Sequence, residues 1–406
     1  MRNRLVLLLA TVSGVAVGNV YFPQSLTPSI AAGLHVSPAG AASVITATQI
    51  GYTAGLFLLV PLGDRFPVRR LLPLLLTVTG AGLLVAAAAP GLPALVALSL
   101  LIGTSTVVAP IVGPFVAGLV SPSRRGVTNG LLLSGSTGGM LLARTASGYL
   151  ASWWSWRVPY LLAGVLVLVL AAVLARALPA AVPTTNAGYL RLLVEPLRLL
   201  GREPGLRRSC LYQATIFGGF SAVWACVALL LTGPRFGYDA RAVGLLALVN
   251  AGTMIVTPLA GRQVDRRGPD VVNLVCAAGV IVSALVLGPA STGALLPLIL
   301  GTLLLDVAMQ SGMTANQVRI YALSSSSRSR LNTAYMTCAY FGGAAGSWLG
   351  LRCYATFGWV GVCGLLVVLA SVPTVALLPR VLNRCFDLGQ RASSVTRDSR
   401  TTVTRI

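Results

Sequence analysis

The chain has 406 residues, of which 55% belong to the set AVILMFWYC and only 10% are charged, and its mean hydropathy is +0.83. A soluble domain carries about 25% charged residues, so most of this surface must face lipid, and a soluble enzyme and a secreted scaffold are excluded. The formal net charge of +21 comes from arginines in short breaks between apolar runs, which is the pattern of cytoplasmic loops and not of a nucleic-acid-binding surface.

Twelve apolar runs are long enough, at about 20 residues per crossing, to span a bilayer as helices. The first begins after Met1–Arg4 like a signal peptide, but it runs on without a small-residue cleavage site, so we expect it to be retained. The expected spans lie at 5–28, 41–62, 71–89, 93–120, 127–150, 158–178, 209–231, 241–260, 271–290, 293–315, 331–351 and 359–379.

These spans divide into two sets of six, separated by the longest internal polar stretch. We expect an N-terminal six-helix bundle over 1–178, a linker over 179–208 and a C-terminal six-helix bundle over 209–380. Within the linker, leucines fall on one helical face and Arg191 and Arg198 on the other, which predicts an amphipathic helix on the membrane surface. The tail over 381–406 is rich in Ser, Thr and Arg without an apolar period, and we expect it to be disordered.

Arginine placement predicts the orientation of the chain. If the N-terminus is cytoplasmic, 25 of the 30 arginines lie on the inner side, four lie outside and one, Arg144, lies within a span. This bias predicts that both termini are cytoplasmic.

The remaining reactive residue types give no sign of a cofactor or metal site. The seven cysteines form no Cys-x-x-Cys pair and most lie inside apolar runs, so we expect small buried hydrophobic side chains. The spans contain no histidine and no paired carboxylates, and the chain lacks the G-x-x-x-x-G-K-[ST] motif, so we expect neither an enzyme nor an ATPase. The single histidine, His35, falls in the first external loop, where we expect no proton-relay role.

Three landmarks repeat between the two halves of the chain. The offsets are 201 residues for Asp64 and Asp265, 203 for Trp156 and Trp359, and 205 for Arg125 and Arg330. Nearly constant offsets indicate a duplicated six-helix unit. Parallel duplication of six spans is typical of secondary transporters that bind substrate near the bilayer midplane, between the halves.

At these residues the sequence resembles the major facilitator superfamily, and within it the twelve-span bacterial drug:proton antiporters. The family signature G-x-x-x-D-R-x-G-R-R follows the second span. The second-half copy matches it at Gly261, Asp265, Arg266 and Gly268, and the first-half copy at Asp64, Arg65, Arg69 and Arg70, with Val60 and Pro67 at its glycine positions. The resemblance covers about 5–380 and implies two pseudo-symmetric six-helix bundles, the major facilitator fold.

The resemblance implies that Asp64, Asp265 and the neighbouring arginines form a cytoplasmic latch that breaks and reforms as the halves move. We place Asp64 at the start of the third span, where the positive helix terminus would stabilise a carboxylate. The alternative interpretation is that these arginines only fix the topology.

Two features of the antiporters are missing or altered. Residues 93–120 hold no charge, although those antiporters carry an arginine in the fourth span, and Met140 stands where their fifth-span motif has proline. Several glycines instead favour close packing between helices. They are Gly135, Gly138, Gly139 and Gly148, with the counterparts Gly342, Gly343 and Gly346.

Only two ionisable residues, Arg144 and Asp306, lie well inside the expected spans. A charge at the bilayer centre costs a few kcal/mol, so such residues usually face a cavity or a partner. In the superfamily fold the tenth span lines the central cavity, so we expect Asp306 to carry the coupling proton. Arg144 is then either its counter-charge or a separate anchor for an anionic substrate. The alternatives are a fixed ion pair for Asp306 and a guanidinium that reaches out to the interface for Arg144.

Polar and aromatic side chains in the spans are candidates for a substrate cavity, although each could instead hold helices together. The candidates are Asn19, Tyr21, Gln24, Gln49, Tyr52, Tyr212, Gln213, Trp224, Asn250, Gln310, Tyr335 and Tyr340.

The leading hypothesis is a monomeric, proton-driven exporter of drug-like molecules, antibiotics or secondary metabolites, working by alternating access in a bacterial inner membrane. The arginine-only, alanine-rich composition resembles that of high-GC bacteria, in which such exporters are common. One alternative is an importer of a sugar, nucleoside or organic acid, although importers of polar solutes usually need more polar groups in the cavity. A more remote alternative is a membrane sensor or scaffold that transports nothing.

Overall fold

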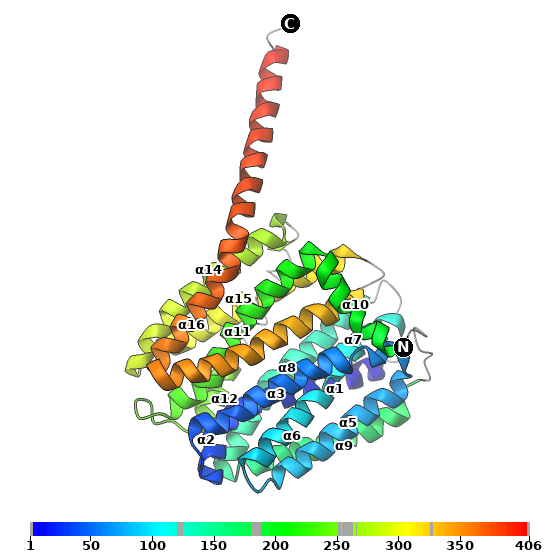
Figure 1. Ribbon diagram of the computed structural model, residues 1–406, viewed down its shortest axis with the longest axis vertical. Coiled ribbons are helices and arrows are strands. Elements are labelled where there is room, and N and C mark those ends of the chain that lie inside the picture. Colours follow the sequence, from blue (N-terminus) through cyan, green and yellow to red (C-terminus); the bar gives the residue numbers. More distant parts are fainter. Residues whose placement is uncertain are drawn as a thin grey trace.

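The computed structural model describes residues 3–119, 125–179, 188–250, 253, 263–264, 266–324 and 328–403. In these ranges every regular element is a helix (Figure 1). Nine of the described helical segments are long and apolar enough to cross a membrane, and the last of them contains two helices that meet at Gly358. The eighth expected span lies partly outside the described residues, so the count of twelve stays a prediction.

The N-terminal half contains helices that run back and forth through one bundle (Figure 1). They are α1 (Asn3–Tyr21), α2 (Pro23–Leu34), α3 (Pro38–Leu58), α4 (Leu62–Arg65), α5 (Val68–Ala87), α6 (Leu92–Ser105), α7 (Val108–Leu119), α8 (Arg125–Trp153) and α9 (Arg157–Ala177).

Prolines divide two of the expected spans into pairs of helices. The first span breaks between α1 and α2 at Pro23, and the fourth breaks between α6 and α7, where Pro110 has no N–H to bond the carbonyl of Thr106. The carbonyl of Thr106 accepts instead from the N–H of Val108, at 2.8 Å. The Thr106 hydroxyl at this break donates to the carbonyl of Ala16 on α1, also at 2.8 Å, and so joins the two broken spans.

The second half follows the linker helix. Its elements are α10 (Tyr189–Arg202), α11 (Pro204–Thr232), α12 (Ala240–Val249), α14 (Pro269–Leu287), the 3-10 helix η3 (Gly288–Thr292), α15 (Leu295–Leu323) and α16 (Arg328–Val403). Gly268 precedes α14 with φ +80°, and Gly358 interrupts α16 with φ +64°. These left-handed conformations favour glycine, so both residues are suited to mark the helix boundaries.

The C-terminal tail follows the last helix of the bundle. The disorder expected over 381–406 stays a prediction; in the structure α16 runs on after Gly358 through Val403 and extends away from the bundle (Figure 1). A helix that has already formed gains one backbone hydrogen bond for each residue that it adds, so it can continue past its apolar segment without a new nucleus.

In each half of the chain, glycines allow two helices to pack closely, and the two helix pairs occupy equivalent positions in the halves. A Cβ on Gly139 of α8 would lie 2.1 Å from the carbonyl oxygen of Gly14 on α1. A Cβ on Gly346 of α16 would likewise lie 2.1 Å from the carbonyl oxygen of Gly218 on α11. Gly14 corresponds to Gly218, and Gly139 corresponds to Gly346, at similar sequence offsets. The duplication seen in the sequence is therefore also seen in how the helices pack. For Gly139 and Gly346, the close-packing role is therefore observed.

The bundle has two chemically different ends. We call the arginine-rich end the one that holds α4, the start of α5 and α10, with Arg65, Arg69, Arg70, Arg198 and Arg202. The opposite end is the one at which α2 ends and α3 begins.

Side-chain hydrogen bonds join the halves from the middle of the bundle to the opposite end. Near that end the Arg241 guanidinium of α12 donates to the Ser152 hydroxyl of α8, at 2.7 Å. Deeper in the bundle the Thr46 and Ser347 hydroxyls, on α3 and α16, lie 3.2 Å apart. The described conformation is therefore closed at the opposite end.

The amphipathic linker helix α10 contacts both halves at the arginine-rich end. The Tyr189 hydroxyl donates to the carbonyl of Leu58 at 2.7 Å, and the Arg330 guanidinium donates to the Glu195 carboxylate. Partial burial raises the pKa of the Tyr189 phenol, so the hydroxyl keeps the proton that it donates. One short helix thus connects the end of α3 with the start of α16.

Candidate functional site

Arg144 lies inside the bundle with an exposed fraction of 0%. Helix α8 carries it, and the close contact of Gly139 with Gly14 brings this helix against α1. One turn after Arg144, the Ser147 hydroxyl donates to the carbonyl of Phe22 at the break between α1 and α2, at 3.2 Å. These contacts fix the side of α8 that faces the centre.

Three aromatic rings surround the Arg144 guanidinium. Its Cζ lies 4.1 Å from the ring centroid of Trp224, 5.0 Å from that of Tyr21 and 6.0 Å from that of Phe220. The electron-rich faces of aromatic rings attract a cation, by about 2 kcal/mol or more for each desolvated contact. The rings therefore offset part of the cost of burying this charge.

The rings supply no hydrogen-bond acceptor to the guanidinium. Nε, Nη1 and Nη2 of Arg144 are all buried, and none of them has a hydrogen-bond partner among the described residues. An arginine carries five N–H donors, and leaving a buried charged group unpaired costs several kcal/mol. Such an arrangement is unusual for a residue that only stabilises a fold.

Asp306 lies in α15, about 16 Å from the opposite end at about 1.5 Å per residue, which is near the middle of a bilayer core of about 30 Å. Its exposed fraction is 4%. The indole Nε1 of Trp224 donates to its Oδ1 at 3.1 Å, and the side chain of Asn250 lies beside it. The amide of Asn250 makes no hydrogen bond of normal geometry to any described residue.

Trp224 contacts both buried charges, through its ring face to Arg144 and through its ring nitrogen to Asp306. No ion pair within 4.0 Å joins Arg144 to Asp306 among the described contacts. The sequence left two roles open for Arg144, the counter-charge of Asp306 and an anchor for an anionic substrate. Among the residues that it describes, the structure shows no direct salt bridge that would support the first role. We call Tyr21, Arg144, Phe220, Trp224 and Asp306 the central cluster.

Sequence analysis missed much of the aromatic part of this region. Phe217, Phe220, Ser221 and Trp224 follow one another at i, i+3, i+4 and i+7, so they share one face of α11. The Phe217 and Phe220 rings stack with centroids 5.6 Å apart, and the Phe220 and Trp224 centroids are 6.3 Å apart. This period was visible in the sequence, but phenylalanines in an apolar span resemble ordinary packing residues.

Several predicted cavity residues lie between the halves. The Tyr21 and Tyr340 hydroxyls are 3.0 Å apart, and the rings of Tyr52 and Tyr340 have centroids 4.5 Å apart. The Ser347 hydroxyl donates to Oε1 of Gln49 at 2.9 Å, and the Gln49 amide nitrogen lies 3.5 Å from the Ser221 hydroxyl. Ser221 and Ser347 were not among the sequence candidates.

Other candidates lie elsewhere and hold helices of one half together. Asn19 donates to the Thr106 hydroxyl at 3.4 Å within the N-terminal half. The Tyr335 hydroxyl donates to Oε1 of Gln213 at 2.8 Å within the C-terminal half, while the neighbouring Tyr212 packs against α15.

Two further candidates for the substrate cavity, Gln24 and Gln310, lie apart from the contacts described above. Gln24 is fully buried in α2, and neither its amide oxygen nor its amide nitrogen has a hydrogen-bond partner among the described residues. Gln310 lies one turn after Asp306 on α15 and is half-buried. The described contacts of the central cluster include neither residue.

The predicted latch residues of the first half gather at the arginine-rich end. Asp64 and Arg65 lie in the one-turn helix α4, and Arg69 and Arg70 lie exposed in the first turn of α5. Asp64 therefore precedes the third span by a separate turn and does not begin it as expected, because Pro67 stands at the N-cap of α5.

In the second-half motif, Gly261 and Asp265 lie outside the described residues, while Arg266 is exposed. The structure shows an acidic residue at this end that the sequence analysis did not select. Asp270, in the first turn of α14, pairs with Arg319 of α15 and lies 4.0 Å from Nη1 of Arg208 on α11. This network ties three helix ends together within one half.

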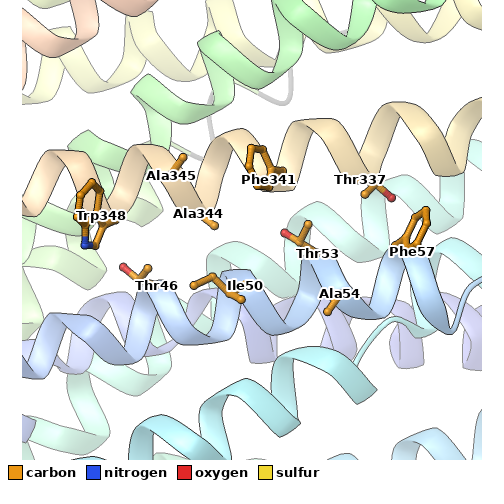
Figure 2. A pocket seen from close by; sticks show the side chains of 10 residues that line it. All are labelled: Thr46, Ile50, Thr53, Ala54, Phe57, Thr337, Phe341, Ala344, Ala345 and Trp348. Atoms are coloured by element: carbon orange, nitrogen blue, oxygen red, sulfur yellow. The ribbon is translucent and has the colours of Figure 1, made fainter. Parts of the chain in front are cut away.

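A groove of about 580 Å³ lies between the halves on the side of the bundle. Figure 2 shows side chains of α3, among them Thr46 and Phe57, facing those of α16 such as Thr337 and Ala344. Trp348 in its wall is 52% exposed. The lining is almost entirely apolar, as expected for a surface that meets lipid, and it does not include the central cluster.

Comparison with known proteins identifies the class of protein. The model of the Major Facilitator Superfamily matches residues 7–347, so the chain belongs to this family. It is therefore a multi-pass membrane protein and a secondary transporter of small molecules. The expected all-α fold of two helix bundles is confirmed.

Two bacterial transporters are similar in sequence along most of their lengths. The uncharacterized transporter YgaY of Escherichia coli O157:H7 is 35% identical over 359 residues, which cover 88% of this chain and 91% of YgaY. The probable transporter SCO4007 of Streptomyces coelicolor is 33% identical over 364 residues, which cover 88% of this chain and 83% of SCO4007.

Solved structures share the fold at low sequence identity. A peptide transporter, POT, in complex with sulfate has a TM-score of 0.74 at 14% identity and covers 93% of this chain and 95% of its own. A mutant of the nucleoside transporter NupG has a TM-score of 0.70 at 12% identity, covering 93% of this chain and 99% of its own. A D-xylose-proton symporter has a TM-score of 0.67 at 17% identity, covering 91% of this chain and 96% of its own.

Proposed function

We propose that the protein is a proton-coupled exporter of small, partly hydrophobic molecules, in which Asp306 carries the proton. The observation that carries the proposal is the environment of this carboxyl group. Among the described buried residues it is the one acidic side chain, and the indole of Trp224 donates a hydrogen bond to it. A carboxylate this deeply buried gains from taking up a proton because burial penalises its charged form, and in this fold it lies between two halves that can alternately admit protons from each side.

The surroundings of Asp306 favour a partly hydrophobic substrate. Aromatic rings from both halves, those of Tyr21, Phe220, Trp224 and Tyr340, line the central region. A mostly apolar pocket with a few convergent polar groups is typical of sites for drug-sized compounds. Antibiotics and secondary metabolites have this chemistry.

Alternating access requires that the closed end open while the other end closes. The arginine-rich end is proposed to be cytoplasmic, with both termini on that side of a bacterial inner membrane. The described conformation, closed at the opposite end, is then the inward-facing one. Asp64, Arg65, Arg69 and Arg70, with the second-half motif of Gly261, Asp265, Arg266 and Gly268, are proposed to act as the latch that closes the cytoplasmic end.

Accumulation of labelled antibiotics and dyes in cells that express the protein tests this function. Wild type should lower accumulation, and both Asp306→Asn and a protonophore should abolish the effect, because neither a neutral amide nor a collapsed gradient can deliver the proton. Asp239→Asn is the matched control, since Asp239 is an exposed carboxylate at the opposite end and asparagine can still cap α12. An Asp306→Asn variant that exports like wild type would rule out the proposed proton site.

One observation favours a second candidate, the uptake of an organic acid together with a proton. The Arg144 guanidinium has no hydrogen-bond partner among the described residues, and an acid anion bound there and a protonated Asp306 would together leave the site neutral. Transport of the acid anion and the proton in the same direction avoids carrying a net charge through the bilayer core. In the same assay this candidate predicts that expression raises, and a protonophore lowers, the accumulation of a labelled acid.

A further inference from the structure

We propose that Arg144 is the binding site for an anionic group of the substrate, so that the transported molecules are amphipathic acids with a carboxylate beside an apolar or aromatic body. The inference deepens the proposed function and rests on it for the statement that the bound acid is transported. Its structural basis is the state of the guanidinium, which is fully buried, near mid-membrane and without a hydrogen-bond acceptor among the described residues.

The described contacts lack the direct salt bridge that the simplest structural role for Arg144 would require. An arginine that only neutralises a buried aspartate would be expected to make a direct charge-assisted hydrogen bond to it. Here the indole of Trp224 lies against the guanidinium and donates to Asp306, and all three Arg144 nitrogens stay without acceptors among the described residues. Within the part of the chain that the structure describes, these donors therefore remain available to an oxygen of a bound ligand.

The surroundings also favour a particular ligand chemistry. A guanidinium is a planar fork that matches the two oxygens of a carboxylate, and the aromatic faces of Tyr21, Phe220 and Trp224 leave its N–H edge as the polar direction. The same rings would pack against an apolar substrate body. The nearby Asn250 side chain adds a neutral polar contact beside Asp306.

Access to Arg144 requires movement within the bundle. Arg144 and Trp224 both have no exposed surface in the conformation closed at the opposite end, so an anion can reach the guanidinium only after the side chains around it move. Trp224 and Phe220 belong to α11, whereas Arg144 belongs to α8 of the other half. Movement of one half relative to the other would therefore open and close the site.

Binding to the purified full-length chain tests the proposal without any need for transport. The probes are the sodium salts of benzoate and phenylacetate, with benzamide and phenylacetamide as neutral partners of the same shape. The readout is the thermal unfolding midpoint, which rises when a ligand binds the folded state only. We expect saturable stabilisation by the acids, little by the amides, and at least about tenfold weaker acid binding in Arg144→Gln.

Arg157→Gln is the matched control, because Arg157 also lies over a tryptophan, with its Cζ 4.3 Å from the Trp156 ring centroid, but at the opposite end of the bundle. This variant should bind the acids like wild type. If Arg144→Gln does not give folded protein, Arg144→Lys replaces it, and it should bind the acids more weakly because an ammonium lacks the planar fork. Equal stabilisation by acids and amides, no stabilisation by either acid, or unchanged acid binding in the Arg144 variant would each overturn the assignment.

Asp306→Asn separates this inference from the proposed function. It removes the negative charge that would repel an anion across the indole, so it should bind the acids at least as tightly as wild type while failing to transport. Acid binding without any proton-driven transport in wild type would leave the Arg144 site standing and reject the exporter. Proton-driven export by a protein that binds no acid would support the exporter and reject the Arg144 site.

Discussion

Trp224 is the residue on which both membrane charges depend. Its indole ring covers Arg144 and its Nε1 donates to Asp306, although Arg144 and Asp306 come from different halves. Neither contact can be made by an aliphatic side chain, and only the first can be made by phenylalanine. Substitution at this one position can therefore separate the packing contribution from the hydrogen bond.

We expect Trp224→Phe to keep the aromatic contact with Arg144 but to leave Asp306 without its donor. Removing the donor from a buried acceptor costs about 1–3 kcal/mol, so the unfolding midpoint of the purified protein should fall and transport should slow. Trp348→Phe, on the exposed wall of the side groove, is the control and should change neither quantity. A Trp224→Phe protein as stable and active as wild type would mean that this hydrogen bond is unimportant.

Glycines allow the helices of the bundle to pack closely against one another. Helices α1 and α8 approach until a Cβ on Gly139 would overlap the backbone of α1, whereas a Cβ on Gly138 would meet no atom within 4 Å. Two neighbouring glycines on one helix thus have different roles. Without a hydrophobic force between helices in lipid, such close backbone contact is a main source of helix association.

Gly139→Ala should therefore push α8 away from α1 and destabilise the protein. Overpacking of this kind costs about 1–3 kcal/mol, and it should displace Arg144 from the ring of Tyr21. Thermal unfolding of purified Gly139→Ala and Gly138→Ala provides the comparison, and only the first should unfold at a lower temperature. Equal midpoints would mean that the helices have room to adjust.

Across the whole molecule, contacts between the halves are concentrated toward one end. The hydroxyls of Thr46 and Ser347, 3.2 Å apart on α3 and α16, mark this closed region. A rocking transporter must separate these residues once in each cycle. The same two positions can be used to stop the cycle.

The double variant Thr46→Cys/Ser347→Cys should lose transport under oxidising conditions and recover it with a reducing agent. Hydroxyl oxygens this close indicate that the two sulfur atoms can meet with ordinary disulfide geometry. Each single variant, tested with the same oxidant, controls for the native cysteines and should stay active. Continued transport by the cross-linked double variant would show that this end does not need to open.

The sequence was informative wherever one residue type has few uses in a membrane. Arg144 and Asp306 stood out because charges in a span are costly, and the structure brings both to the centre. The packing of Phe217 and Phe220 beside them was not predicted, because an aromatic residue in an apolar span has no such cost. The lack of a direct Arg144–Asp306 ion pair was also beyond prediction, since it depends on how helices from different halves meet.

The sequence predicted where the helices lie better than where they break or continue. Apolar length located the spans, but the breaks at Pro23 and Pro110 were not anticipated, although proline lacks the N–H that a continuous helix requires. The composition of the tail predicts disorder for an isolated segment, whereas the helix through Val403 continues one that has already formed, which composition does not describe. Local signals thus predicted the elements better than their continuity.

The shared position of Trp224 also makes it a natural optical reporter. The emission of an indole responds to charges near its ring, and this indole lies beside a cation and donates to a carboxyl group that can change protonation state. Ligand binding at Arg144 and proton release from Asp306 would therefore alter the fluorescence of a single residue. Subtracting the spectrum of Trp224→Phe from that of wild type isolates this signal from the other five tryptophans. The order of the two events could then be followed in time without attaching any label.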